Sequence, residues 1–174
     1  NGDGRTDFLC TDGEEDWWNG YQMYRSGTKN KMPMEKVADG LNKLTKISYK
    51  YLSQAGSPYT KGSGTVFPVF DSQGPLPVVS SVLTDNGLGT QNTINYTYQG
   101  LKIHQRGKGF LCYSKQTITD VASNMSSESN FGFNPDYFFP MLMSTVIKVG
   151  STTMSSVENS WSRLITANGV VFPY

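Results

Sequence analysis

The sequence predicts an all-β protein built from antiparallel hairpins, and three observations favour this fold. Polar and apolar residues alternate with a period of two in several stretches, as in strands with one buried face. Turn sequences rich in Asn, Asp and Gly separate these stretches. No stretch supports a helix of ten or more residues, and Pro33 interrupts the best candidate, at 28–40. We therefore expect hairpin-built sheets, arranged as a shell or a sandwich.

The clearest strands are "LTKISYKY" (44–51) and "TINYTY" (93–98). In each, an isoleucine and two tyrosines share one face, while Lys, Ser, Thr and Asn occupy the other. We expect these tyrosines to form cross-strand packing ladders. They are Tyr49, Tyr51, Tyr96 and Tyr98. Further β-type runs lie at 78–83, 110–119, 141–149 and 160–166.

Turn chemistry predicts where hairpins close. Asp39-Gly40 and Asn168-Gly169 each lie beside a strand-like run, and "YQG" (98–100) also has the composition of a turn. Two stretches have no regular pattern: 53–64 is rich in Gly, Ser and Pro, and 120–137 is polar and then aromatic. We expect the first of these to be a long loop.

Composition argues against several functional classes. The 174 residues carry 15 Lys and Arg against 14 Asp and Glu, a net charge of +1, which does not favour a nucleic-acid binder. No apolar run approaches the ~20 residues that span a bilayer. The densest basic stretch, 102–108, contains His104, which we interpret as a structural hydrogen-bonding residue because it has no evident partner.

Motifs for catalysis are absent from the sequence. It contains no Ser-His-Asp set, phosphate-binding loop or CxxC pair, and the single histidine argues against zinc. The two cysteines, Cys10 and Cys112, lie in apolar stretches and are interpreted as small buried hydrophobic residues. A disulfide between them, or a nucleophilic pair of Cys112 with His104, is an alternative that the sequence leaves open.

The stretch "DGEEDWW" (12–18) places four acids beside Trp17 and Trp18. Neighbouring residues on a strand point to opposite faces, so one of these tryptophans is expected to be exposed and able to bind a glycan or a surface. A carbohydrate- or surface-binding module is thus one alternative. A glycoside hydrolase is a more remote alternative. It would use paired carboxylates from Asp12, Glu14, Glu15 or Asp16.

The first residues, "NGDGRTDF", have the spacing of a calcium loop. Asn1, Asp3 and Asp7 match side-chain ligand positions, and the carbonyl of Arg5 matches a backbone position. The first ligand position would precede Asn1, so we interpret the chain as part of a longer polypeptide in which calcium can bind. No other cofactor is expected.

Several motifs in order resemble one family. They are "NGDGRTDFL", "DGLNKLTKISYKYL", "SPYTKG" and the stretch 75–111, whose most specific part is 78–111. The chain resembles the middle/N-terminal region of insecticidal toxin-complex B components, plasmid-virulence B-type proteins and the wider Rhs/YD-repeat proteins. Its opening resembles the end of an FG-GAP/VCBS-type propeller repeat. The resemblance covers about residues 1 to 120.

This resemblance implies a structural role without catalysis. Residues 1–35 would end a propeller-like repeat, and residues 36–174 would form a β domain of a shell or its junction with the propeller. The partners would be other domains of the same large polypeptide, including an enclosed toxin or cargo segment, in a secreted or cell-surface bacterial protein. Neither nucleic acid nor a direct membrane span is expected.

Overall fold

A computed structural model describes residues 34–165, 167 and 169, together with the strands at 7–10, 22–25 and 171–173. Within these residues every regular element is a strand, and the all-β prediction is confirmed. The strands are β1 (Asp7–Cys10), β2 (Gln22–Arg25), β3 (Lys36–Ala38), β4 (Leu44–Tyr51), β5 (Tyr59–Thr60), β6 (Val69–Asp71), β7 (Pro77–Asp85), β8 (Gln91–His104), β9 (Gly109–Asp120), β10 (Met125–Phe133), β11 (Pro140–Val149), β12 (Thr152–Glu158), β13 (Arg163–Ile165) and β14 (Val171–Pro173).

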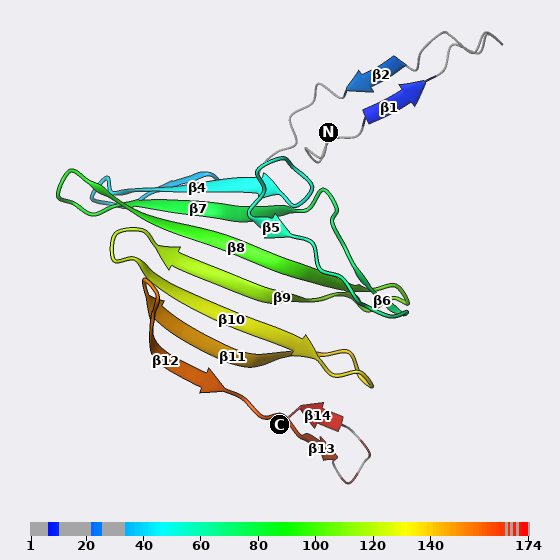
Figure 1. Ribbon diagram of the computed structural model, residues 1–174. Helices are drawn as coiled ribbons and strands as arrows, with labels where there is room; N and C mark the ends of the chain where they lie inside the picture. Colours follow the sequence, from blue (N-terminus) through cyan, green and yellow to red (C-terminus); the bar gives the residue numbers. More distant parts are fainter. Residues whose placement is uncertain are drawn as a thin grey trace.

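One sheet of ten strands dominates the molecule (Figure 1). Its main path runs β12-β11-β10-β9-β8-β7-β4-β3, and every neighbouring pair on this path is antiparallel. From β8 to β12 each strand lies beside the one before it in the chain. Two further two-stranded sheets are formed by β1 with β2 and by β13 with β14.

Strand β8 is the longest, with 14 residues, and it has two kinds of neighbour on one edge. Its first residues, 91–95, pair with β7. Its later residues pair with β5, in parallel through Tyr59 and Tyr98, and with β6, in antiparallel orientation through 102–104. The segment between β4 and β7 therefore pairs with the later part of β8, which extends beyond β7.

The predicted alternation is present in the sheet. In β8, Ile94, Tyr96 and Tyr98 are half-buried, whereas Asn95 and Thr97 are exposed. Following the cross-strand register from these residues identifies one face on which apolar side chains recur among Ser, Thr, Gln and Asp residues. We call it the apolar face, and its apolar residues include Ile94, Tyr96, Ile118, Met125, Ile147, Val149 and Val157.

The opposite face is polar. Asn95 pairs with Thr119, which pairs with Ser126, and Ser126 pairs with Lys148. On the same face Glu128 forms ion pairs with Lys115 at 3.0 Å and Lys148 at 3.1 Å. These two salt bridges join three neighbouring strands, although exposed pairs of this kind stabilise a fold only weakly. We call this the polar face.

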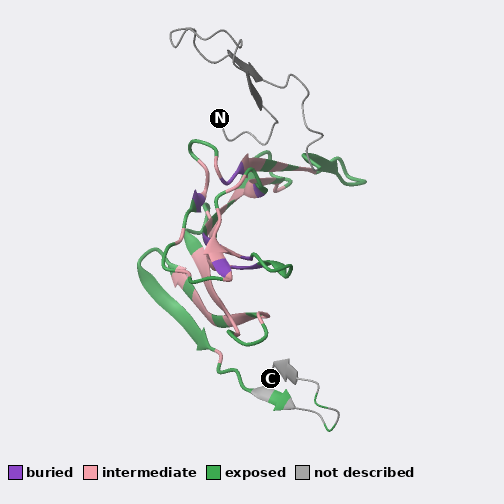
Figure 2. Ribbon diagram, turned by 90° about the vertical axis from the view of Figure 1, so that its right-hand side faces the viewer, coloured by how far each residue is buried: buried purple, intermediate pink, exposed green. Residues whose placement is uncertain are grey.

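Buried residues gather near β8 and the segment between β4 and β7 (Figure 2). One cluster contains Leu52, Tyr59, Val78 and Leu101, with Tyr98 and Tyr113 packed against it. A second contains Val69, Leu111 and Cys112, with Phe131, Phe133 and Phe138 packed against it. Strand β12, in contrast, is exposed along its whole length.

Hydrogen bonds tie the segment before β7 to these clusters. The Tyr59 hydroxyl donates to the Ser72 carbonyl at 2.6 Å and accepts from the Leu101 amide at 2.9 Å. Asp71 forms an ion pair with Lys102 and accepts a hydrogen bond from the Thr65 hydroxyl at 2.9 Å. Because the Asp71 and Lys102 side chains are almost fully buried, this pair anchors β6 against β8.

Two local predictions were wrong. Residues 120–137, expected to be irregular, contain strand β10, whose Ser-rich sequence alternates too weakly to be recognised. The sequence "YQG" is not a turn, because Gly100 lies inside β8 with φ 61°. Gly100 occupies this position because a Cβ atom there would overlap the Ser114 hydroxyl. The predicted turn at Asp39-Gly40 does connect β3 to β4.

Candidate functional site

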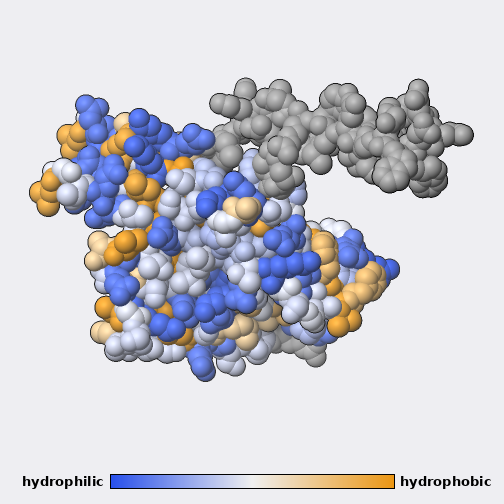
Figure 3. Space-filling view, turned by 45° about the horizontal axis from the view of Figure 1, so that its top comes forward, coloured by the Kyte–Doolittle hydropathy of each residue, from blue (hydrophilic) through white to orange (hydrophobic). Residues whose placement is uncertain are grey.

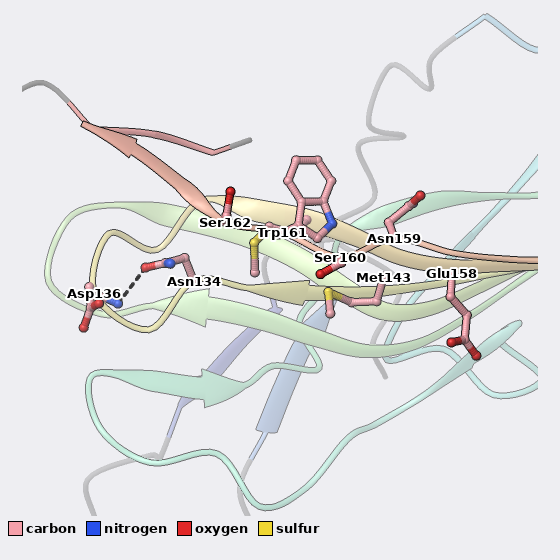
Figure 4. A pocket seen from close by; sticks show the side chains of 9 residues that line it. Asn134, Asp136, Met143, Glu158, Asn159, Ser160, Trp161 and Ser162 are labelled. Carbon is pink, nitrogen blue, oxygen red and sulfur yellow. Dashed lines mark hydrogen bonds between the residues drawn. The ribbon is translucent and has the colours of Figure 1, made fainter. Parts of the chain in front are cut away.

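A cavity lies where β10 ends, β11 begins and β12 ends (Figure 4). Its volume is about 960 Å³. The turn from β10 to β11 contributes Asn134 and Asp136, and the first part of β11 contributes Met141 and Met143. The remaining wall is the stretch from Glu158, at the end of β12, to Ser162.

Three hydrogen bonds fix the segment after β12 against β11. The Asn159 amide donates to the Met143 carbonyl at 2.8 Å, and its side-chain Nδ2 donates to the Leu142 carbonyl at 3.1 Å. The Trp161 indole Nε1 donates to the same Leu142 carbonyl at 2.8 Å. Trp161 is thereby held in one orientation while 39% of its surface stays accessible.

The turn that forms the other wall is also ordered by its own hydrogen bonds. The Asn134 Oδ1 atom accepts from the amides of Asp136 at 2.9 Å and Tyr137 at 3.0 Å, which is the pattern of an Asx turn. The Phe138 amide closes the turn onto the Asn134 carbonyl at 2.8 Å. These bonds occupy the Asn134 oxygen and leave the Asp136 carboxylate facing solvent.

Met143 packs against β10 at Gly132. A Cβ atom on Gly132 would lie 3.4 Å from Cγ of Met143, which is an ordinary van der Waals contact. Met143 is also the additional residue at the register shift between β10 and β11. The shift locally alters the alternation of β11 and brings both Met141 and Met143 to the cavity.

The cavity carries two carboxylates, Asp136 and Glu158, and none of the described residues that line it is Lys, Arg or His. Neither acid forms a salt bridge within the described residues. In Figure 4 Asp136 lies at one end, Glu158 lies at the other, and Trp161 stands between them. The site thus combines an aromatic surface with separated hydrogen-bond acceptors, and its charge disfavours anions.

A second, smaller groove of about 430 Å³ is mostly apolar. Phe67, Phe133 and Phe138 line it, and the Arg106 guanidinium lies 6.0 Å from the centre of the Phe67 ring. His104 is buried beside this groove, with its ring 4.4 Å from that of Phe138. The His104 Nδ1 atom accepts from the Arg106 amide at 3.2 Å, so this histidine closes the β8–β9 turn.

The predicted ladder tyrosines lie apart from the cavity. Tyr98 packs against Tyr113 with 5.0 Å between ring centres, and burial raises the pKa of Tyr98 to about 12. The Tyr49 hydroxyl donates to the Met34 carbonyl at 3.1 Å. Tyr51 is buried, and Tyr96 pairs with Ile118 across β8 and β9. All four belong to the main sheet.

Cys112 is a free, buried thiol. Its Sγ atom lies 3.7 Å from the Gly132 carbonyl, and burial raises the pKa of the thiol despite the nearby charge of Lys102. No hydrogen bond joins Cys112 to His104 among the described residues. A high pKa and an inaccessible sulfur are the opposite of what a nucleophilic cysteine needs.

Several predicted site residues lie outside the described residues. They are Asn1, Asp3 and Arg5 of the calcium-type loop, the acids at 12–16, and Trp17 and Trp18. Asp7 and Cys10 fall in β1, for which only the strand itself is described. In the part of the chain that is described, no group of three or more His, Cys, Asp or Glu side chains is placed to hold a metal ion.

Sequence reasoning missed the cavity. Trp161 fell within a run interpreted as a strand, although β13 begins only at Arg163. The signal was present in "ENSWS" (158–162), which lacks the alternation of a strand, and in "NPDY" (134–137), which has the composition of a turn. Their proximity depends on the pairing of β10, β11 and β12.

Comparisons of the chain with protein-family models, curated proteins and solved structures give no match. Within the described residues we find no helix with the length and apolar character needed to cross a bilayer.

Proposed function

We propose that this chain is a non-catalytic structural β segment of a larger polypeptide, in which another part of that polypeptide covers the apolar face. The observation that carries the proposal is the small amount of burial. Among the described residues only eight apolar side chains are buried, and none of them belongs to β10, β11 or β12. A self-sufficient domain of comparable size buries a core on all of its strands.

The apolar face is the surface that lacks a cover. Ile118 of β9, Ile147 and Val149 of β11, and Val157 of β12 are between 36% and 53% exposed, although they share one side of the sheet. Fully burying a side chain of this size stabilises a fold by roughly 1.5–3 kcal/mol. Covering the exposed part of each would therefore contribute on the order of 1 kcal/mol per residue. Figure 3 shows one side of the molecule, on which hydrophobic residues are interspersed with hydrophilic ones.

The polar face supports the same role. Its Ser, Thr and Asn residues and the ion pairs of Glu128 are suited to water, whereas the exposed Ile and Val side chains of β9, β11 and β12 gather on the apolar face. Such a sheet is suited to form a wall. The resemblance to toxin-complex B components adds the setting: a secreted or cell-surface β shell, or its junction with a propeller.

A hydrophobic dye tests whether the apolar face is uncovered. The folded chain is expected to bind anilinonaphthalene sulfonate and increase its fluorescence. Replacing Ile147 with Ser should decrease this signal strongly. Replacing Val146 with Ser is the matched control, because Val146 is the neighbouring residue of β11 on the polar face. It should leave the dye signal almost unchanged.

Circular dichroism must show that each variant keeps its β structure, because an unfolded chain also binds the dye. A folded wild-type chain without dye fluorescence would contradict the proposal. Equal signals from the Ile147→Ser and Val146→Ser variants would contradict it as well, since dye binding would then not depend on the apolar face.

A further inference from the structure

The cavity beside Trp161 has a chemistry that the structural role does not use. We propose that it binds an uncharged saccharide. The proposal does not depend on the wall-forming role, because the cavity is formed by the turn after β10 and the segment after β12, and not by the apolar face.

The aromatic platform is the first argument. Trp161 is partly exposed, and its orientation is fixed by the hydrogen bond from Nε1 to the Leu142 carbonyl. A ligand therefore meets an indole that has already lost its rotational freedom, which lowers the entropic cost of binding. Sugar rings present C–H groups on one face, and these pack on a flat aromatic surface. Met141 and Met143 extend the apolar floor of the cavity.

The mixture of donors and acceptors is the second argument. Sugar hydroxyls donate and accept at once, so a saccharide site needs both kinds of group. The Asp136 and Glu158 carboxylates accept, and the hydroxyls of Ser160 and Ser162 donate and accept. The Asn134 Nδ2 group adds a donor, because only the oxygen of this side chain is used by the turn. A purely cationic ligand would need acceptors alone.

Charge and size narrow the ligand class. Among the described residues that line the cavity there are two carboxylates and no Lys, Arg or His, and this negative charge repels uronic acids and other anionic sugars. The volume of about 960 Å³ lies at the upper end of the range for small-molecule sites, roughly 300–1,000 Å³. Trp161 stands between the two acids in Figure 4, so one ring can stack on the indole while neighbouring rings reach either carboxylate. We expect an oligosaccharide of two or three rings.

Isothermal titration calorimetry tests the proposal directly. Neutral cello- and chito-oligosaccharides are titrated into the wild-type chain, with oligogalacturonate as the anionic probe and trilysine as the cationic one. We expect at least one neutral saccharide to bind and oligogalacturonate not to bind. The Trp161→Ala variant should lose affinity on the order of tenfold or more. The matched control is the double variant Trp17→Ala/Trp18→Ala, which should keep wild-type affinity.

A second variant protects the test against misfolding, because Trp161→Ala also removes a hydrogen bond. Glu158 is exposed at the end of an edge strand, so Glu158→Lys should fold normally. It should weaken neutral saccharide binding and allow oligogalacturonate to bind. The proposal is overturned by any of three results: no binding of a neutral saccharide at millimolar concentration, loss of binding only in the Trp17/Trp18 variant, or binding of trilysine alone.

Discussion

Gly100 offers a sharp test of how β8 and β9 fit together. It lies in the middle of a 14-residue strand with φ 61°, a conformation that favours glycine. A Cβ atom at this position would overlap the Ser114 hydroxyl and lie 3.0 Å from the Ser114 Cβ atom. The Cα atom of Gly62 would be 3.7 Å away on the other side. Gly100→Ala should therefore destabilise the sheet for two separate reasons.

The two costs can be estimated. The left-handed conformation costs a residue with a Cβ atom roughly 1–2 kcal/mol. Crowding by one additional carbon in a packed site costs typically about 1–3 kcal/mol. We expect Gly100→Ala to lower the free energy of unfolding by about 3 kcal/mol. That is a large fraction of the roughly 5–15 kcal/mol by which most domains are stable.

Urea unfolding followed by circular dichroism measures this change, and two other glycines serve as controls. Gly109 also has a positive φ, of 68°, but a Cβ atom there would meet nothing within 4 Å. Gly109→Ala should cost only the conformational part, about 1–2 kcal/mol. A Cβ atom on Gly40 would likewise meet nothing within 4 Å, and its φ lies outside the left-handed range. Gly40→Ala should change stability by less than about 0.5 kcal/mol.

A background lacking the Ser114 side chain separates the two costs. In a Ser114→Gly chain the overlap disappears, so adding Gly100→Ala should then cost about as much as Gly109→Ala. The reasoning is refuted if Gly100→Ala and Gly109→Ala destabilise the wild-type chain equally. It is also refuted if the cost of Gly100→Ala is the same with and without the Ser114 side chain.

Two further predictions concern charge. Burial alone would raise the pKa of the Asp71 carboxyl, but hydrogen bonds from Lys102 and Thr65 together hold this pKa below its ordinary value. The contribution of the Asp71 carboxylate to stability is therefore lost as the pH falls from about 4 through that lowered pKa. Asp71→Asn should make stability, measured by urea titration, depend less on pH in the acid range. It should also lower the free energy of unfolding by about 2–3 kcal/mol near neutral pH, because Lys102 loses its charged partner. An unchanged dependence of stability on acid pH would contradict this prediction. Burial raises the pKa of Tyr98 to about 12, so unfolded chains ionise first and stability should fall as the pH rises above about 10. Tyr98→Phe should remove part of the stability loss above pH 10. The same loss in the variant and in the wild-type chain would argue against burial of Tyr98.

The strands with the most regular patterns could be predicted from the sequence. The alternation in 44–51 and 93–98 identified both the strands and their half-buried faces, because the isoleucines and tyrosines are buried or half-buried, whereas most of the polar residues between them are exposed. Asp39-Gly40 located the first turn of the sheet for a similar reason. Its chemistry is local, with the Asp39 carboxylate accepting from the amides of Leu41 and Lys43 at 2.8 Å each.

Features that depend on distant residues could not be predicted. Strand β10 was missed because its pairing partners on β9 and β11 determine its conformation more than its own Ser-rich composition. Gly100 was assigned to a turn because its real neighbours, Ser114 and Gly62, are far away in the sequence. Tyr59 looked like part of a loop, yet it is buried against Leu101, 42 residues later in the chain.

The cavity shows the same limit more strongly. Asp136 and Trp161 are separated by two strands in the chain, and they line one cavity only because β11 returns between them to bring the two segments together. No sequence motif connects Asp136 with Trp161, because only the pairing of the strands brings these two residues together. The predicted ligand-binding tryptophans, Trp17 and Trp18, stay a prediction.

The order of the strands also affects how the sheet can form. From β8 to β12 each new strand pairs antiparallel with the one just before it, across turns of only a few residues. Closing such short connections is fast, and local pairing of this kind shortens the search for the native arrangement. A chain leaving the ribosome can add each of these strands to the growing edge as it emerges. The segment between β4 and β7 is the exception, because β5 and β6 must wait for β8 before they have a partner.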